Sequence, residues 1–178
     1  MKTVTAFAFA LLVPAAANAQ IHLEVTVGGK TLDVRDAQNH VLASYQISPG
    51  MTGHATPTGN FTIRKIVWNP AWVPPKAGWA KGKQATAPGD PKNPMKVVKI
   101  FFKEPDLYLH GTGDEQKLGD PASHGCIRMA QADAYNLARL LMQAGGAAKS
   151  DSWYQSVING ARSVTVVLPK PAPLRITA

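Results

Sequence analysis

The sequence LHGT at residues 109–112, followed by SHGCIRM at residues 123–129, holds the only cysteine of the 178-residue chain and two of its five histidines. A thiol attacks as its thiolate, and a nearby imidazole can accept the thiol proton. His110 and His124 both stand close to Cys126 in the sequence, and a glycine follows each histidine. Glycine permits close approach of the backbone, so that consecutive N–H groups could face an oxyanion. The pattern predicts a Cys/His nucleophilic site.

Other interpretations of these residues stay open. A lone cysteine is often a small buried hydrophobe, and a lone histidine is often a surface residue. Clusters of His and Cys also bind zinc, but there is no second cysteine and no His-Glu-x-x-His pattern, so no complete ligand set is visible. One cysteine excludes a disulfide within the chain.

The same stretch resembles the signature of the L,D-transpeptidase (YkuD-like) catalytic domain, in which a His-Gly pair precedes Ser/Thr-His-Gly-Cys-hydrophobic-Arg/Asn. Two upstream segments add to the resemblance, in the order of the family. Residues 55–63 (ATPTGNFTI) resemble its Thr-Pro-x-Gly-x-Phe segment. Residues 69–75 (NPAWVPP), with the later Pro-Gly-Asp and Asn-Pro pairs of residues 88–94, resemble its long loop.

The resemblance implies a role for each matched residue. The catalytic set comprises Cys126 as nucleophile, His110 as general base and acid, His124 in support, the Gly111 carbonyl orienting His110, and the Gly125 N–H in the oxyanion hole. The residues expected to contact substrate are Ser123, Arg128, Thr112 and Trp72. No cofactor and no metal are expected.

The function implied is an exported peptidoglycan L,D-transpeptidase. Cys126 would attack the carbonyl of the third stem-peptide residue in a tetrapeptide donor, release D-alanine, and pass the acyl group to an acceptor amine. Alternatives on the same fold are an L,D-carboxypeptidase, an enzyme that anchors a protein to the wall, and one that hydrolyses cross-links. A catalytically silent wall-binding module and a zinc hydrolase are the alternatives from other classes.

Residues 1–19 have the features of a secretory signal peptide: a lysine, an apolar run, and Ala-Asn-Ala before Gln20. A membrane anchor would need about twenty apolar residues, roughly twice this run. We therefore expect an exported periplasmic protein without a membrane segment after cleavage. Residues 20–168 would form one catalytic domain, and residues 169–178, with three prolines, a loose tail.

The formal net charge is +8, with basic residues spread along the chain. A basic surface can attract nucleic acid, anionic lipid or an acidic polymer. No stacking-aromatic motif or basic helix of a nucleic-acid reader is visible, so we expect peptidoglycan stem peptides, and no nucleic acid, as partners. We expect the protein to be a monomer.

Alternation of apolar and polar residues predicts a mostly β fold of about seven strands. Residues 130–144 carry the one main helix pattern, and a shorter one covers 152–158. The resemblance implies a β-sandwich or partly closed barrel of mixed sheets with this helix near the active site. Cys126 would lie just ahead of the helix, whose positive end could favour a thiolate. The expected strands span residues 21–27, 31–35, 41–47, 61–68, 96–102, 106–110 and 163–168.

Residues 69–95 form a long irregular segment with two tryptophans. Such segments in compact domains are commonly binding loops. It is either a lid over the active site or a cover for one face of the sheet. Among the loop residues, Asp114, Glu115 and Asp120 could orient a histidine, meet a substrate amine or simply be solvated, and His54 is expected at the surface.

Overall fold

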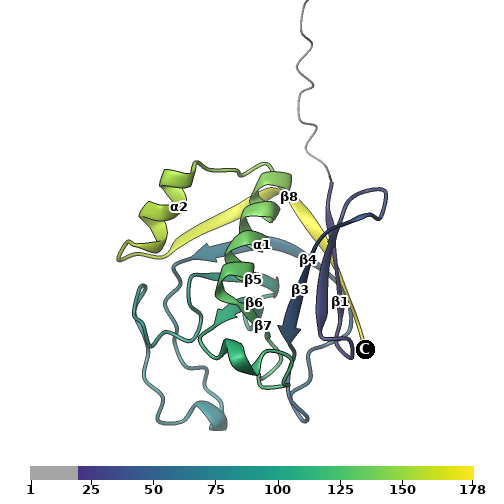
Figure 1. Cartoon of the computed structure of the whole chain (residues 1–178). Helices are drawn as coiled ribbons and strands as arrows, with labels where there is room; N and C mark the ends of the chain where they lie inside the picture. Colours follow the sequence, from purple (N-terminus) through teal and green to yellow (C-terminus); the bar gives the residue numbers. More distant parts are fainter. Residues whose placement is uncertain (1–19) are drawn as a thin grey trace, which may run out of the picture.

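The computed structural model describes residues 20–178, and the expected signal peptide lies outside them. Two α-helices, α1 (Gln131–Ala144) and α2 (Asp151–Ile158), accompany eight strands (Figure 1). The strands are β1 (His22–Thr26), β2 (Thr31–Arg35), β3 (Val41–Ser48), β4 (Gly59–Trp68), β5 (Val98–Lys103), β6 (Leu107–Thr112), β7 (Ile127–Ala130) and β8 (Val164–Thr177). Within residues 20–178, no helix is long and apolar enough to span a membrane.

The strands close into one barrel in the order β1-β2-β3-β7-β6-β5-β4-β8. The sheet is mixed, because β6 pairs with β7 and β1 pairs with β8 in parallel, whereas the other pairs are antiparallel. In a closed barrel, the backbone N–H and C=O groups that would be unpaired at the edges of an open sheet form hydrogen bonds with a neighbouring strand. The predicted mostly β class with one main helix is confirmed.

The last strand, β8, corrects the expectation of a loose C-terminal tail. Residues 164–177 form one strand that pairs with β4 on one side and with β1 on the other. Its pairing with β4 is interrupted between Val167 and Ala172, which gives two of the prolines a place without ladder partners on that strand. Leu174 and Ile176 are almost fully buried. Their burial, together with pairing on both sides, stabilises these residues as a strand despite the three prolines.

Strands β5, β6 and β7 have two different faces. Ile100, Leu109 and Ile127 are fully buried in the hydrophobic core. The same core includes Leu137 and Leu141 of α1, which runs across these strands in Figure 1. Because side chains alternate along a strand, the residues between these core positions point to the opposite face. That face carries the residues of the catalytic motif.

A short strand that the sequence did not predict, β7, lies between Cys126 and the main helix, which begins at Gln131, one residue after its expected start. Four strand residues separate Cys126 from α1. The helix N-terminus instead receives Glu115, whose carboxylate accepts a hydrogen bond from the backbone N–H of Gln131 at 2.9 Å. The dipole of α1 is therefore offset by a carboxylate, and the thiolate does not lie at the first turn, where this effect is felt.

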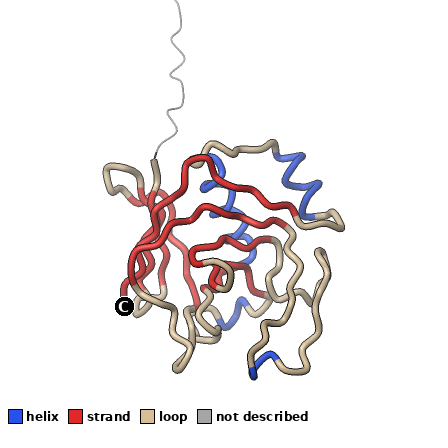
Figure 2. Tube along the Cα trace, turned by 180° about the vertical axis from the view of Figure 1, so that it is seen from behind, coloured by secondary structure: helices blue, strands red, loops and turns tan. Residues whose placement is uncertain are grey.

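Residues 69–95 are tied at their start to the segment after α2, and their end is tied back to their start. The Asn69 side chain donates to the carbonyl of Gly160 at 2.7 Å, and the Asn93 side chain donates to that of Pro70 at 2.7 Å. Trp72 and Thr86 form a two-way backbone bridge within it. Figure 2 shows the segment as a loop, with the short 3-10 helix η1 (Gly78–Ala80), extending to one side of the barrel.

Candidate active site

The parallel pairing of β6 and β7 brings the two halves of the motif together. Leu109 lies opposite Ile127, and His110 lies opposite Arg128. Cys126 immediately precedes β7, so continuing this register places it near Tyr108. By the alternation of side chains, Tyr108, His110, Cys126 and Arg128 share the face that points away from the core. His110, on β6, and Cys126, immediately before β7, are sixteen positions apart in the sequence, and the pairing of these adjacent strands brings them together.

The turn before Cys126 depends on Gly125. Its φ is +104°, and a Cβ there would meet the Leu107 side chain at 3.0 Å, so a larger residue would be strained. The Thr56 hydroxyl, from the matched Thr-Pro-x-Gly segment, donates to the Gly125 carbonyl at 3.2 Å. The upstream motif therefore supports the turn before Cys126 directly.

Two expectations about this turn are corrected. The Gly125 N–H, expected to face an oxyanion, donates to the Ser123 hydroxyl at 3.2 Å. The Ser123 hydroxyl in turn donates to the carbonyl of Cys126, and the residue is only 3% exposed. Ser123 was expected to contact substrate, but burial and these two bonds give it the role of holding the turn.

His110 is 4% exposed, and its Nδ1 lies 2.7 Å from the carbonyl oxygen of Gly111. Because a carbonyl only accepts, Nδ1 carries the proton in the neutral ring and Nε2 keeps a free lone pair. The contact predicted between Gly111 and His110 is present. Burial lowers the pKa of His110 to about 4, and the charges of Arg128 and Lys99 act in the same direction. The Gly111 carbonyl acts in the opposite direction. Because the resulting pKa is well below 7, the ring is neutral at pH 7.

The thiol of Cys126 is partly exposed and donates to the carbonyl of Asp106 at 3.4 Å. Burial raises its pKa, whereas hydrogen bonding from Tyr108 and the charges of Lys99 and Arg128 lower it. Within residues 20–178, no hydrogen bond joins this thiol to His110. Catalytic hydrogen bonds often tighten only when substrate is bound. The resting state is accordingly a neutral thiol beside a neutral imidazole.

Sequence reasoning missed two residues of this face, Tyr108 and Lys99. Burial raises the pKa of Tyr108, so its hydroxyl remains a hydrogen-bond donor. The Lys99 ammonium lies 4.9 Å from the Tyr108 ring centroid and donates to the carbonyl of Ala71 at 3.1 Å. Tyr108 could have been found, because it lies two residues before His110 on one strand face. Lys99 could not, because only the pairing of β5 with β6 places it opposite His110.

His124 lies in a cluster of rings rather than at the thiol. It stacks on Trp79, with centroids 3.9 Å apart and planes at 11°, and its centroid is 4.5 Å from that of His54. Burial and the neighbouring charges of His54, Lys83 and Arg128 lower its pKa. Trp72, expected to contact substrate, is only 8% exposed, and it is Trp79, at 36%, that reaches the motif.

Thr112 and Arg128 both line a cavity of about 230 Å³ at the end of β6. Thr112 is 8% exposed, and its hydroxyl accepts from the backbone N–H of Asp114 at 3.1 Å. Arg128 is partly exposed, and its charge reaches both His110 and Cys126. Residues 20–178 contain no group of three or more His, Cys, Asp or Glu side chains placed to hold a metal ion.

The comparison with protein families agrees with these features. The model of the YkuD family, the L,D-transpeptidase catalytic domain, matches residues 21–164. The chain belongs to this family.

Two relatives from Bacillus subtilis strain 168 carry L,D-transpeptidase names. The chain is 28% identical to YkuD over 120 residues, which cover 67% of this chain and 60% of YkuD. It is 33% identical to YqjB over 96 residues, which cover 51% of this chain and 49% of YqjB. The chain thus spans less than two thirds of the length of either relative.

Solved structures show the same fold. An L,D-transpeptidase from Mycobacterium smegmatis aligns with 90% of this chain and 59% of its own, with a TM-score of 0.55 at 16% identity. L,D-transpeptidase 3 from Mycobacterium tuberculosis, solved with a faropenem-derived adduct, aligns with 90% and 61%, with a TM-score of 0.56 at 15% identity. At such identities the likeness concerns the fold alone.

Proposed function

We propose that this protein is an exported L,D-transpeptidase that acts on peptidoglycan stem peptides through Cys126. The donor is a tetrapeptide stem, and its third residue supplies the carbonyl that is attacked. The observation that carries the proposal is the buried His110, oriented by the Gly111 carbonyl at 2.7 Å on the strand beside the cysteine. A neutral imidazole with a free Nε2 is the form that a general base requires.

In the first half-reaction, Cys126 Sγ attacks the carbonyl carbon between the third residue and D-alanine. The thiol proton passes to His110, which requires a shift of the thiol or the ring from the resting arrangement. The backbone N–H of Cys126 and the hydroxyl of Tyr108 stabilise the tetrahedral oxyanion. The C–N bond then breaks, His110 returns the proton to the leaving amine, and D-alanine departs, leaving a thioester.

In the second half-reaction, an amine from another stem peptide attacks the thioester carbonyl. His110 accepts the amine proton, the C–S bond breaks, and the thiol is re-formed beside the new amide bond. Lys99 and Arg128 add positive charge near the sulfur, which lowers the free energy of the thiolate form in each step. The surroundings of Cys126 therefore favour a thiolate that forms only during the reaction, over a permanent ion pair between a Cys126 thiolate and a protonated His110.

The acceptor decides between the transpeptidase and its alternatives. Water in place of the amine gives a carboxypeptidase, and a protein amine gives attachment of that protein to the wall. We infer that the acceptor approaches past Trp79 of η1 and His124 of the turn before β7, because these two rings stack on each other next to Cys126 in the sequence motif and neither is fully buried. We further propose that residues 1–19 are a signal peptide that directs export of the protein. The protein would then act in the periplasm as a monomer.

Product analysis tests this function. The protein beginning at Gln20 is incubated with purified disaccharide-tetrapeptide, and muropeptides are identified by mass spectrometry. Cross-linked dimers, each formed with loss of one D-alanine, are expected with the natural sequence and not with Cys126→Ala. If tripeptide forms without dimers, water resolves the thioester and the protein is an L,D-carboxypeptidase instead of a transpeptidase. The absence of any product or adduct from folded protein would refute it.

A further inference from the structure

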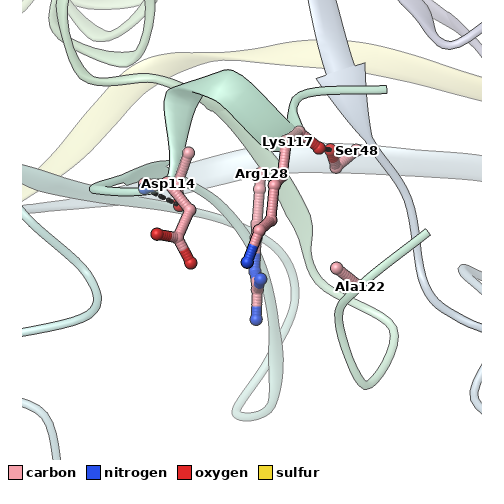
Figure 3. A pocket seen from close by; sticks show the side chains of 6 residues that line it. Ser48, Asp114, Lys117, Ala122 and Arg128 are labelled. Atoms are coloured by element: carbon pink, nitrogen blue, oxygen red, sulfur yellow. Dashed lines mark hydrogen bonds between the residues drawn. The ribbon is translucent and has the colours of Figure 1, made fainter. Parts of the chain in front are cut away.

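The net positive charge of the protein comes from one continuous stretch, residues 61–103, which includes most of β4, the segment of residues 69–95, and β5. This stretch contains nine Lys and Arg residues and a single acid, Asp90. The rest of residues 20–178 contains nine Lys and Arg residues and ten acids. In that remainder, cations lie among acids, as Figure 3 shows for Lys117 and Arg128, which share a cavity with Asp114. The excess charge therefore belongs to one region of the fold.

Within this stretch, residues 73–85 form a closed loop, which we call the basic loop. Its neck is the two-way backbone bridge between Trp72 and Thr86, with N···O distances of 3.0 and 2.9 Å. Trp72 is buried, and two further backbone hydrogen bonds fold the centre of the loop into η1. Figure 2 shows η1 at the lower extremity of the molecule, beyond the barrel. Because the loop is already folded, a partner surface would meet it without a large cost in ordering entropy.

The basic loop presents cations without acids. Lys76, Lys81 and Lys83 are exposed, and residues 73–85 contain no Asp or Glu. None of these three lysines belongs to an ion pair among residues 20–178. The Nζ of Lys83 lies over the Trp79 ring, 4.9 Å from its centroid. Three positive charges on one loop are thus available to an anionic surface.

The same loop exposes apolar groups. Val73 is 72% exposed, more than any other large hydrophobic side chain within residues 20–178. Pro74 and Pro75 follow it, and their fixed φ stiffens the backbone that carries it. An exposed apolar side chain among lysines gains nothing from a soluble polyanion. Both kinds of side chain fit the surface of a lipid bilayer, where charged headgroups meet acyl chains.

We propose that the basic loop docks the protein on the surface of an anionic phospholipid bilayer. Its three lysines contact the lipid phosphates, and Val73 enters the boundary between headgroups and acyl chains. The contact is peripheral and reversible, because these side chains supply far less binding free energy than a membrane-spanning helix. Since Trp79 of the same loop stacks on His124, the docked protein holds its Cys/His motif close to the lipid surface. This inference goes beyond the proposed function and does not depend on it.

Vesicle binding tests the docking with Cys126→Ala protein that begins at Gln20, so that no catalysis is required. The probes are vesicles of phosphatidylcholine alone and vesicles of equal parts phosphatidylglycerol and phosphatidylcholine, and co-sedimentation gives the partition coefficient. Each lysine near an anionic surface strengthens binding about fivefold. We therefore expect binding to the anionic vesicles to be about 100-fold tighter than to the neutral ones, and to weaken with added salt. Equal binding to both vesicles, or binding to neither, would overturn the proposal.

Charge-matched variants locate the docking surface. Lys76→Gln/Lys81→Gln should weaken binding to the anionic vesicles about 25-fold, because two contacts with phosphate are lost. The control, Lys149→Gln/Lys170→Gln, removes the same charge from exposed positions outside residues 61–103 and should bind within about twofold of its parent. Equal losses in the two double variants, at an unchanged Tm, would mean that net charge alone drives the attraction and would contradict the assignment to the basic loop.

The apolar contact distinguishes a bilayer from a soluble acidic polymer. Cys126 is the only cysteine, so Val73→Cys in the Cys126→Ala protein carries a single thiol for a fluorophore that reports polarity. We expect its emission to shift to shorter wavelength on anionic vesicles. The same label on Leu42→Cys, an exposed site at the start of β3, should not shift.

Val73→Ser should also weaken binding to the anionic vesicles about fivefold, because an apolar side chain loses its contact with lipid. Lysine-dependent binding with unshifted emission at residue 73, and with no loss in Val73→Ser, would indicate an acidic polymer as the partner. That result would overturn docking on a bilayer.

Discussion

The two histidines of the motif stand in opposite kinds of environment. His110 lies on β6, is 4% exposed, and is fixed by a hydrogen bond to the backbone next to it. His124 lies in the turn before β7 and is held by stacking on Trp79, a residue from a segment 45 positions earlier. Under the proposed mechanism, the strand pair would carry proton transfer, and the loops would govern access and positioning.

The largest effect is expected at His110. His110→Gln should lower the rate of Cys126 acylation by about 100- to 10,000-fold, because the general base is removed while the amide keeps a similar shape. Rapid-mixing measurements with the tetrapeptide donor give this rate. Loss of activity with an unchanged Tm would assign the effect to chemistry, and a variant as fast as the natural protein would remove His110 from the mechanism.

His110 should also make stability depend on pH. Its folded-state pKa is about 4, below the 6.5 of an unfolded histidine, so between these values the unfolded chain binds a proton that the folded chain does not. Stability therefore rises with pH across this window. We expect the free energy of unfolding to fall by about 3 kcal/mol more in the natural protein than in His110→Gln between pH 7 and pH 4. Urea unfolding at several pH values measures it, and parallel curves would contradict the buried neutral ring.

Lys99, on β5, should act on the thiol of Cys126 across the intervening strand β6. Replacing Lys99 with Met removes a positive charge that lowers the pKa of Cys126. The thiolate fraction at neutral pH should then fall by up to about tenfold, equivalent to one pKa unit. The pH profile of alkylation by iodoacetamide reports the pKa. Lys103→Met, on the exposed end of the same strand, is the control, and identical profiles for the two variants would show that Lys99 does not tune the thiol.

The smallest effect is expected in the loops. Trp79→Ala removes the ring that stacks on His124, and such aromatic contacts contribute about 0.5–1.5 kcal/mol. We expect KM for the tetrapeptide donor to rise about threefold with little change in the acylation rate at saturation. Trp79→Phe, which keeps an aromatic face, should behave like the natural protein. Equal behaviour of the two variants would mean that stacking does not position His124.

The comparison also explains what the sequence could predict. The proposed nucleophile, the proposed base and the Gly111 contact follow from a local motif, because β6 and the start of β7 carry them side by side. The short strand β7 was missed, because its four residues run directly into the pattern of α1. Strand β8 was missed, because its prolines hid an alternation that pairing on both sides makes stable.

Contacts between segments that are distant in the sequence could not be predicted from any sequence pattern. The stacking of Trp79 on His124 depends on how residues 69–95 fold back, and hydrogen bonds of the Asn69 and Asn93 side chains hold the two ends of this segment. The place of Lys99 depends on the register between β5 and β6. The use of the Ser123 hydroxyl within the turn also became visible only in three dimensions, because the motif alone does not reveal which side of the chain a hydroxyl faces.

The most direct test of this account is the intact mass of the protein within seconds of mixing with disaccharide-tetrapeptide. The account predicts a mass increase equal to the donor minus D-alanine, located on Cys126 by peptide mapping, lost on treatment with hydroxylamine, and absent in Cys126→Ala. A covalent adduct on another residue, or turnover of the donor by Cys126→Ala at the rate of the natural protein, would contradict it.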